Sequence, residues 1–100
     1  MAKMMKQVQK MQSELVRVQE EVAEKTVEAT AGGGAVRAVV SGRLEVKALQ
    51  ISPEAIDPED PELLADLVLA AVNEGIRRAQ EMVQKEMARV TGGLSIPGVF

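Results

Sequence analysis

Residues 26–51 read TVEATAGGGAVRAVVSGRLEVKALQI, and this stretch decides the fold class. Three runs of strand length and β-branched composition are separated by two glycine-containing breaks: 26–31, 35–40 and 44–51. Breaks of this length and composition favour tight turns between antiparallel strands. The pattern therefore predicts a three-stranded antiparallel meander. Near its end, Leu49 and Ile51 shift the phase of the alternation, which indicates a β-bulge or a second buried face.

The residues before the meander carry a helical period instead. Apolar side chains recur at alternating spacings of three and four and define an a/d seam: Met1, Met4, Val8, Met11, Leu15, Val18 and Val22. No glycine or proline interrupts residues 1–25. We expect a helical arm there, about 37 Å long at 1.5 Å per residue.

The residues after the meander form an acidic loop and a second long helix. Residues 52–60 contain acidic side chains and no base. Asp60 can cap a helix and a proline fits the first helical position, so we expect a helix over residues 61–90. Gly75 lies within this helix, where glycine is unfavourable. Either a neighbouring backbone approaches closely and requires a small residue, or the glycine is a tolerated defect. We expect residues 91–100 to form a mobile tail or to dock on a partner.

Composition indicates one small cytoplasmic domain spanning residues 1–100. Hydrophobic residues make up 46% of the chain, but Phe100 is its only aromatic residue. A core of small aliphatic side chains buries little area in a chain this short, which favours oligomerisation. We expect neither a signal peptide nor a membrane span, because no apolar run reaches the length that either requires.

The sequence lacks the residue types that most enzymes and metal sites use. The absence of cysteine and histidine removes thiolate ligands, the commonest zinc ligand and the commonest general base. The serines therefore lack a histidine partner, and the run Gly32–Gly34 lacks the residues of a phosphate-binding loop. The acidic loop lacks the alternating ligands of a calcium site. We expect a non-enzymatic protein with no cofactor, no metal and no small-molecule substrate.

The most informative charged feature lies at the start of the chain. Lys3, Lys6 and Lys10 occur in the first thirteen residues, which contain no acid. In the heptad frame these lysines and Arg17 lie opposite the apolar seam. A free cationic stripe suits a phosphate backbone, because neutralising phosphates releases condensed counterions. The alternative is an ordinary solvated helix face. The net charge is −3, so any argument for nucleic-acid binding must rest on where the basic residues lie rather than on the total charge.

The bases of the second helix divide into two groups. Glu74 precedes Arg78 by four residues and Glu81 precedes Lys85 by four, which predicts two intrahelical ion pairs. The remaining two bases, Arg77 and Arg89, are then freer to contact a ligand.

The heptad seam could pack on a second copy of the same helix or on the second helix of the chain. Its e and g positions lack the complementary charges that a self-pairing coiled coil normally carries. We expect it to pack instead on a similarly spaced set in the second helix: Val72, Ile76, Ala79, Val83 and Val90. The dimer contact would then lie largely elsewhere.

Three stretches resemble one family. The opening 4–12 (MMKQVQKMQ), the helical 66–74 (DLVLAAVNE) followed by Arg77 and Arg78, and the ending 91–100 (TGGLSIPGVF) are similar to the YbaB/EbfC nucleoid-associated proteins. The resemblance covers essentially the whole chain in order.

The resemblance implies an intertwined, tweezer-like α+β homodimer whose helical arms bind duplex DNA in the bacterial nucleoid, with a role in nucleoid organisation or gene regulation. It also suggests a connection to recombination-repair proteins. The expected DNA-binding residues are Lys3, Lys6, Lys10 and Arg17, helped by Arg77 and Arg89. The rival interpretation is an adaptor in replication or recombination repair whose arms clasp another protein without strong DNA binding.

Overall fold

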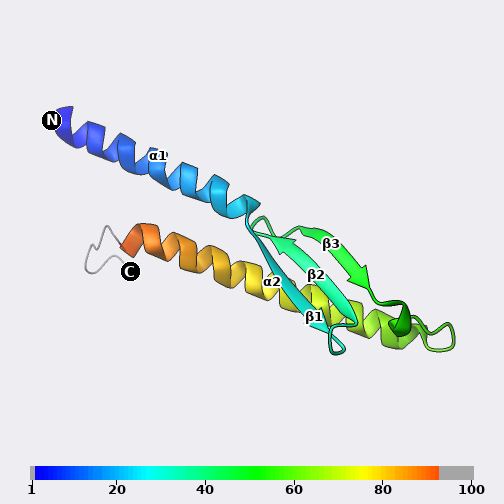
Figure 1. Ribbon diagram of the computed structural model, residues 1–100. Coiled ribbons are helices and arrows are strands. Elements are labelled where there is room, and N and C mark those ends of the chain that lie inside the picture. Colours follow the sequence, from blue (N-terminus) through cyan, green and yellow to red (C-terminus); the bar gives the residue numbers. More distant parts are fainter. Residues whose placement is uncertain (1, 93–100) are drawn as a thin grey trace.

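A computed structural model describes residues 2–92 of the chain (Figure 1). Its elements in order are α1 (Ala2–Glu24), β1 (Thr26–Ala31), β2 (Val36–Ser41), β3 (Val46–Ile51), the short 3₁₀ helix η1 (Pro53–Ala55) and α2 (Pro61–Gly92). The expected α+β fold, with a long helix on each side of a three-stranded meander, is confirmed. Helix α2 continues two residues beyond the expected end, so the expected tail begins later, and residues 93–100 lie outside the described part.

The sheet is antiparallel with strand order β1-β2-β3. Its first turn contains Gly32, Gly33 and Gly34, all at positive φ, a region that favours glycine because it lacks a Cβ. The register between β2 and β3 shifts between Val39 and Val40, leaving Lys47 as the extra residue on β3. This bulge is the physical cause of the phase change seen in the sequence.

The first part of α2 packs on β1 and β2 and forms the small core. Val36, Ala38 and Ala71 are fully buried at its centre, with partly buried aliphatic side chains around them: Ala31, Ile51, Leu64, Leu67, Val68 and Val72. A Cβ on Gly75 would lie 2.6 Å from Val40 Cγ2. A neighbouring group therefore does approach this glycine closely, but the expectation that a backbone does so is wrong, because the nearest atoms belong to the side chain of Val40.

The start of α2 follows its sequence signals. Asp60 Oδ1 accepts a hydrogen bond of 3.2 Å from the backbone N–H of Leu63, the third helical residue, while Pro61 occupies the first position. The cap satisfies one of the amide groups that have no partner inside the helix.

Helix α1 leaves the sheet and runs beside the last turns of α2 (Figure 1). Val22 is buried and the seam residues Met11, Leu15 and Val18 are half-buried. From α2, Val83 and Met87 line a recess with Val22. The expected packing of the seam on α2 therefore holds only at the C-terminal part of the second helix. Val72 belongs to the sheet core instead, because α2 must cover the sheet with its first half, and the side chain of Val90 lies outside the described part.

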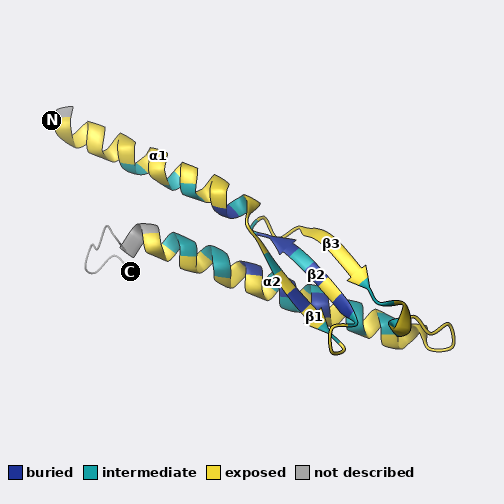
Figure 2. Cartoon of the chain, in the orientation of Figure 1, coloured by how far each residue is buried: buried dark blue, intermediate teal, exposed yellow. Residues whose placement is uncertain are grey.

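The resulting molecule is elongated. Its extents are 71 × 24 × 16 Å and its radius of gyration is 19.3 Å, whereas a compact domain of this length has about 13 Å. Most of α1 and the whole of β3 are exposed or only partly covered in Figure 2. None of the helices in residues 2–92 is long and apolar enough to cross a membrane.

Candidate nucleic-acid interface

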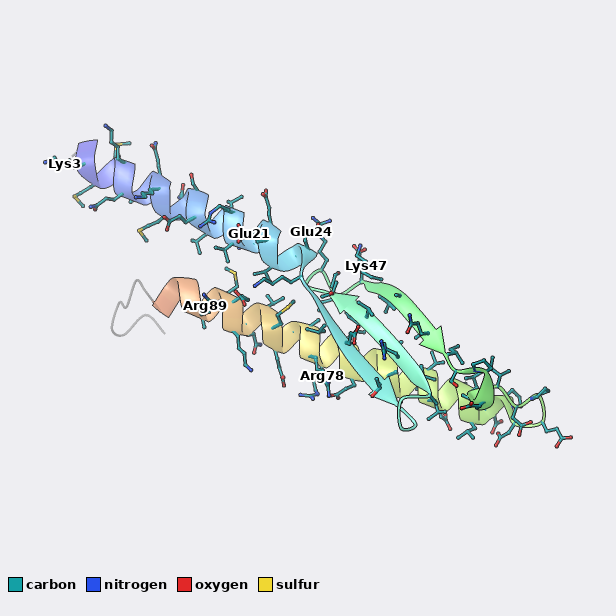
Figure 3. The ribbon with its side chains drawn as sticks, in the orientation of Figure 1. Lys3, Glu21, Glu24, Lys47, Arg78 and Arg89 are labelled. Atoms are coloured by element: carbon teal, nitrogen blue, oxygen red, sulfur yellow. The ribbon has the colours of Figure 1, made fainter. Side chains whose placement is uncertain are left out.

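The lysines of α1 form an exposed cationic surface without ion-pair partners in the described part of the chain. Lys3, Lys6 and Lys10 are exposed and lie on the side of α1 turned away from its seam. Within residues 2–92 no acidic side chain forms an ion pair with any of them. Figure 3 shows Lys3 near the free end of α1. We name these three residues the lysine stripe.

Arg17 continues the same helix face about two turns closer to the sheet than Lys10. Its Nη1 lies 3.2 Å from Glu21 Oε1, and both side chains are largely exposed. Exposed i, i+4 pairs contribute only a few tenths of a kcal/mol, about 0.3–0.5. A phosphate can therefore compete for this guanidinium at small cost.

Arg77 is the most strongly paired base of α2. Its Nε donates a hydrogen bond of 3.1 Å to Glu74 Oε2, and its guanidinium also binds Glu81. The hydrogen bond with Arg77 is the main reason that the pKa of Glu74 lies below its ordinary value of 4.5, with a further contribution from Arg78. The same hydrogen bond raises the pKa of Arg77. The expectation that this arginine is one of the freer bases is wrong.

The ion pairs of α2 follow a different pattern from the one expected. Glu74 pairs with Arg78 as predicted, but Glu81 pairs with Arg77 rather than with Lys85. Arg77 lies three residues after one carboxylate and four before the other, so one forked guanidinium binds both. Arg78 in addition donates to the backbone carbonyl of Glu28 on β1 at 2.9 Å and so ties α2 to the sheet.

Arg89 also has a carboxylate partner, contrary to its expected freedom. Its Nη1 lies 3.4 Å from Glu86 Oε2, and Glu86 Oε1 lies 3.1 Å from Lys25 Nζ. Lys25 follows α1 directly, so Glu86 joins the two helices. A recess of about 290 Å³ lies at this junction, where Arg17, Glu21 and Arg89 line its rim.

Sequence reasoning missed two exposed bases, Lys85 on α2 and Arg37 on β2. Neither forms an ion pair within residues 2–92. The i, i+4 rule pairs Lys85 with Glu81 because it ignores competition from Arg77 for the same carboxylate. The alternation of β2 carried the signal for Arg37, because its neighbours Val36 and Ala38 face the core and leave it on the outer face.

Acidic charge gathers at the opposite end of the molecule. The loop that contains η1 lies far from the free end of α1 in Figure 1. Its carboxylates serve local structure: Asp57 Oδ1 accepts from the Glu59 backbone N–H at 2.9 Å, and Asp60 caps α2. No group of three potential metal-ligating side chains occurs within residues 2–92. The acidic loop therefore lies far from the lysine stripe.

Comparison with known proteins gives a consistent result. The YbaB/EbfC DNA-binding family matches residues 1–94. The chain is 59% identical over 100 residues to a nucleoid-associated protein of Pelotomaculum thermopropionicum, covering all of this chain and 95% of that protein. It is 58% identical over 100 residues to one of Alkaliphilus metalliredigens, covering all of this chain and 88% of that protein.

Solved structures also contain this fold. An uncharacterized protein from Helicobacter pylori superposes with a TM-score of 0.72 at 23% identity, over 95% of this chain and 97% of that one. At this identity the likeness concerns the fold alone.

Proposed function

The chain belongs to the YbaB/EbfC DNA-binding family, and on this premise we propose that it is a nucleoid-associated protein that binds duplex DNA through the lysine stripe. The observation that carries the proposal is the set of three exposed lysines without an acidic partner within residues 2–92. Contacts to phosphates position a protein on a duplex without reading its sequence. Such a protein suits nucleoid organisation or gene regulation in the bacterial cytoplasm.

Arg17, Arg77 and Arg89 take a supporting part in this proposal. Each already has a carboxylate partner, so a phosphate must displace that partner or share the guanidinium. Their contributions to affinity are therefore smaller than those of the lysine stripe.

The binding unit in this proposal is a homodimer. Val46 and Leu49 lie on the same side of the sheet as the buried residues of β2, yet they are 43% and 42% exposed because α2 packs mainly on the first two strands. Leu69 on α2 is 60% exposed. An open sheet edge beside an apolar face is a template for a second chain. A dimer would present two lysine stripes to one duplex. The family assignment and the described residues supply no catalytic constellation, so we propose a binding rather than a catalytic role.

The experiment that tests the DNA site replaces Lys3, Lys6 and Lys10 together with alanine. Affinity for a random duplex is measured by fluorescence anisotropy at fixed salt. Each lost phosphate contact removes counterion release, so we expect the dissociation constant to rise at least roughly tenfold. The matched control replaces Arg37, Arg43 and Lys47, which removes the same charge from the sheet, and should bind nearly as the unmodified protein does. Equal losses of DNA affinity in both variants would show that binding depends on total charge and not on the lysine stripe.

A second candidate function is supported by apolar residues on another side of α1. Met5 is 65% exposed and Val16 is 52% exposed, although neither belongs to the seam. These residues suit a protein partner, such as a recombination-repair protein, clasped by the arms. Capture of a partner that survives nuclease and high salt, together with no shift of duplex DNA by the purified protein, would favour this adaptor role.

A further inference from the structure

A charged recess of about 290 Å³ lies between the end of α1 and the last turns of α2. Three of the residues that line it are bases: Arg17 belongs to α1, Lys25 follows α1 directly, and Arg89 belongs to α2. Two acidic residues, Glu21 and Glu86, line the same recess. Figure 3 shows Glu21 and Arg89 on facing stretches of the two helices. Cations from both helices therefore converge on this recess.

Glu86 binds two of these bases at once. Its Oε1 lies 3.1 Å from Lys25 Nζ, and its Oε2 lies 3.4 Å from Arg89 Nη1. The Glu86 side chain is 22% exposed, less than any other carboxylate that forms an ion pair within residues 2–92. One negative charge with two equivalent oxygens is thus bound by bases from two different elements.

A backbone phosphate offers these bases the same recognition chemistry as the carboxylate of Glu86. It carries one negative charge on two non-bridging oxygens, and lysine and arginine bind it through charge-assisted hydrogen bonds. We propose that the recess is a phosphate-binding site whose phosphate position is occupied by the Glu86 carboxylate, and that a backbone phosphate of the bound duplex displaces this carboxylate. The inference rests on the proposed DNA binding and adds Lys25 to its contact residues.

The ion pairs of Glu86 are weak enough for a phosphate to replace them. The side chains of Lys25 and Arg89 are 48% and 77% exposed, and pairs between exposed, flexible side chains contribute little. Arg17 lines the same recess, and its ion pair with Glu21 is exposed as well. A phosphate in the recess can therefore bind a third base, and its binding also releases condensed counterions.

The position of the recess favours a nucleic-acid backbone over free phosphate as the source of the ligand. Arg17 lies on the same face of α1 as the lysine stripe, so the recess continues that face toward the sheet. Lys10 and Arg17 are seven residues apart, about 10 Å along the helix. About three phosphates of one DNA strand cover this distance along the duplex axis. One duplex can therefore contact the stripe and the recess together.

The substitution Glu86→Gln tests the displacement, because it removes the competing charge and keeps the shape of the side chain. Affinity for a random duplex is measured by fluorescence anisotropy at fixed salt. We expect the dissociation constant to fall roughly fivefold, since Lys25 and Arg89 are no longer held by a carboxylate. The matched control is Glu28→Gln, which removes the same charge from an exposed position of β1 without an ion pair within residues 2–92. Equal affinities of the two variants would overturn the inference.

A substitution of Lys25 distinguishes a phosphate contact from a change in how the two helices are held. In the Glu86→Gln background, Lys25→Ala removes one base from the recess. We expect it to cancel most of the gain in affinity and to make the slope of log K against log salt concentration shallower by about 0.9 for each recess that binds. Unchanged affinity and slope would contradict a phosphate at this position.

A measurement without DNA separates this inference from the proposed function. The probe is inorganic phosphate, and the readout is the NMR signals of the Nε–H groups of Arg17 and Arg89. We expect saturable shifts in Glu86→Gln, with a higher affinity than in the unmodified protein and a lower one when Lys25→Ala is added. The absence of saturable shifts in Glu86→Gln would overturn the site even if the lysine stripe binds DNA. Saturable shifts in a protein that does not bind duplex DNA would contradict both the backbone source and the proposed function.

Discussion

Gly42 shows at the scale of one residue how α1 is joined to the sheet. It lies in the turn after β2, and its backbone N–H donates a hydrogen bond of 2.9 Å to the carbonyl of Lys25. A Cβ at this position would lie 2.1 Å from the carbonyl oxygen of Val22 and 2.8 Å from its carbonyl carbon. Backbone atoms cannot rotate away as a side chain can, so only glycine fits here.

We therefore expect Gly42→Ala to lower the free energy of unfolding by about 2–3 kcal/mol, the range of overpacked sites. Urea denaturation checks the value. The control is Gly33→Ala, where an added Cβ meets no atom within 4 Å and the positive φ of 69° alone opposes the substitution. That strain costs about 1–2 kcal/mol. A loss at Gly33 equal to or larger than the loss at Gly42 would show that the contact with Val22 is not limiting.

Glu74 gives a prediction about pH. Its pKa is lowered in the folded state, first by the hydrogen bond with Arg77 and then by Arg78, so its ionised form favours folding. This contribution is complete above the ordinary pKa of 4.5 and is lost as the pH falls through the lowered value. Thermal unfolding should therefore show a stability advantage over Glu74→Gln at pH 7 that shrinks below pH 4.5.

The control for this prediction is Glu14→Gln, which removes the same charge from an exposed position of α1 that has no ion pair within residues 2–92. An advantage over Glu74→Gln that stays constant, or grows on acidification, would contradict the assigned role of the two arginines.

At the scale of elements, α2 shows what local periodicity can and cannot predict. Capping by Asp60, the extent of the helix and the bulge of β3 are encoded within a few residues, and the sequence indicates each of them. The division of α2 into a half that covers the sheet and a half that meets α1 depends on tertiary packing. The prediction that Val72 packs on α1 is therefore wrong, because the same apolar spacing suits a helix that packs on the sheet.

The same limit applies to the candidate site. The lysine stripe could be predicted because its residues lie in a segment without acids. The pairing of Arg77 and Arg89 could not, because several carboxylates lie within reach of each guanidinium and only side-chain geometry decides among them. The spacing of two residues does not show that several bases on one helix face compete for the same carboxylate.

Strand β3 carries the prediction for assembly. Leu49 lies on the apolar side of the sheet, and Gln50, the next residue, lies on the opposite side because side chains alternate along a strand. If a second copy covers this face, Leu49→Lys buries an unpaired charge and weakens the dimer by about 3 kcal/mol, roughly a hundredfold. Gln50→Lys should leave it intact.

Analytical ultracentrifugation over a concentration series distinguishes the two variants. Equal effects of both substitutions would place the contact elsewhere, and an unmodified protein that sediments as a monomer at micromolar concentration would contradict the dimer.

At the scale of the whole molecule, shape and charge act together. The described chain is 71 Å long, with acidic side chains near one end and the lysine stripe near the other. A negatively charged protein can bind a polyanion in this way because at physiological salt charges are screened beyond about 8 Å. The long axis thus keeps the acidic loop from opposing the arm.

The salt dependence of DNA binding tests the central claim most directly. Each phosphate neutralised lowers the slope of log K against log salt concentration by about 0.9. Two arms with three lysines each would account for about 5 units of slope. If the protein binds as the proposed dimer, the unmodified protein should therefore show a slope steeper by about 5 than the variant in which Lys3, Lys6 and Lys10 are alanine. Equal slopes for the two proteins would contradict binding through the lysine stripe.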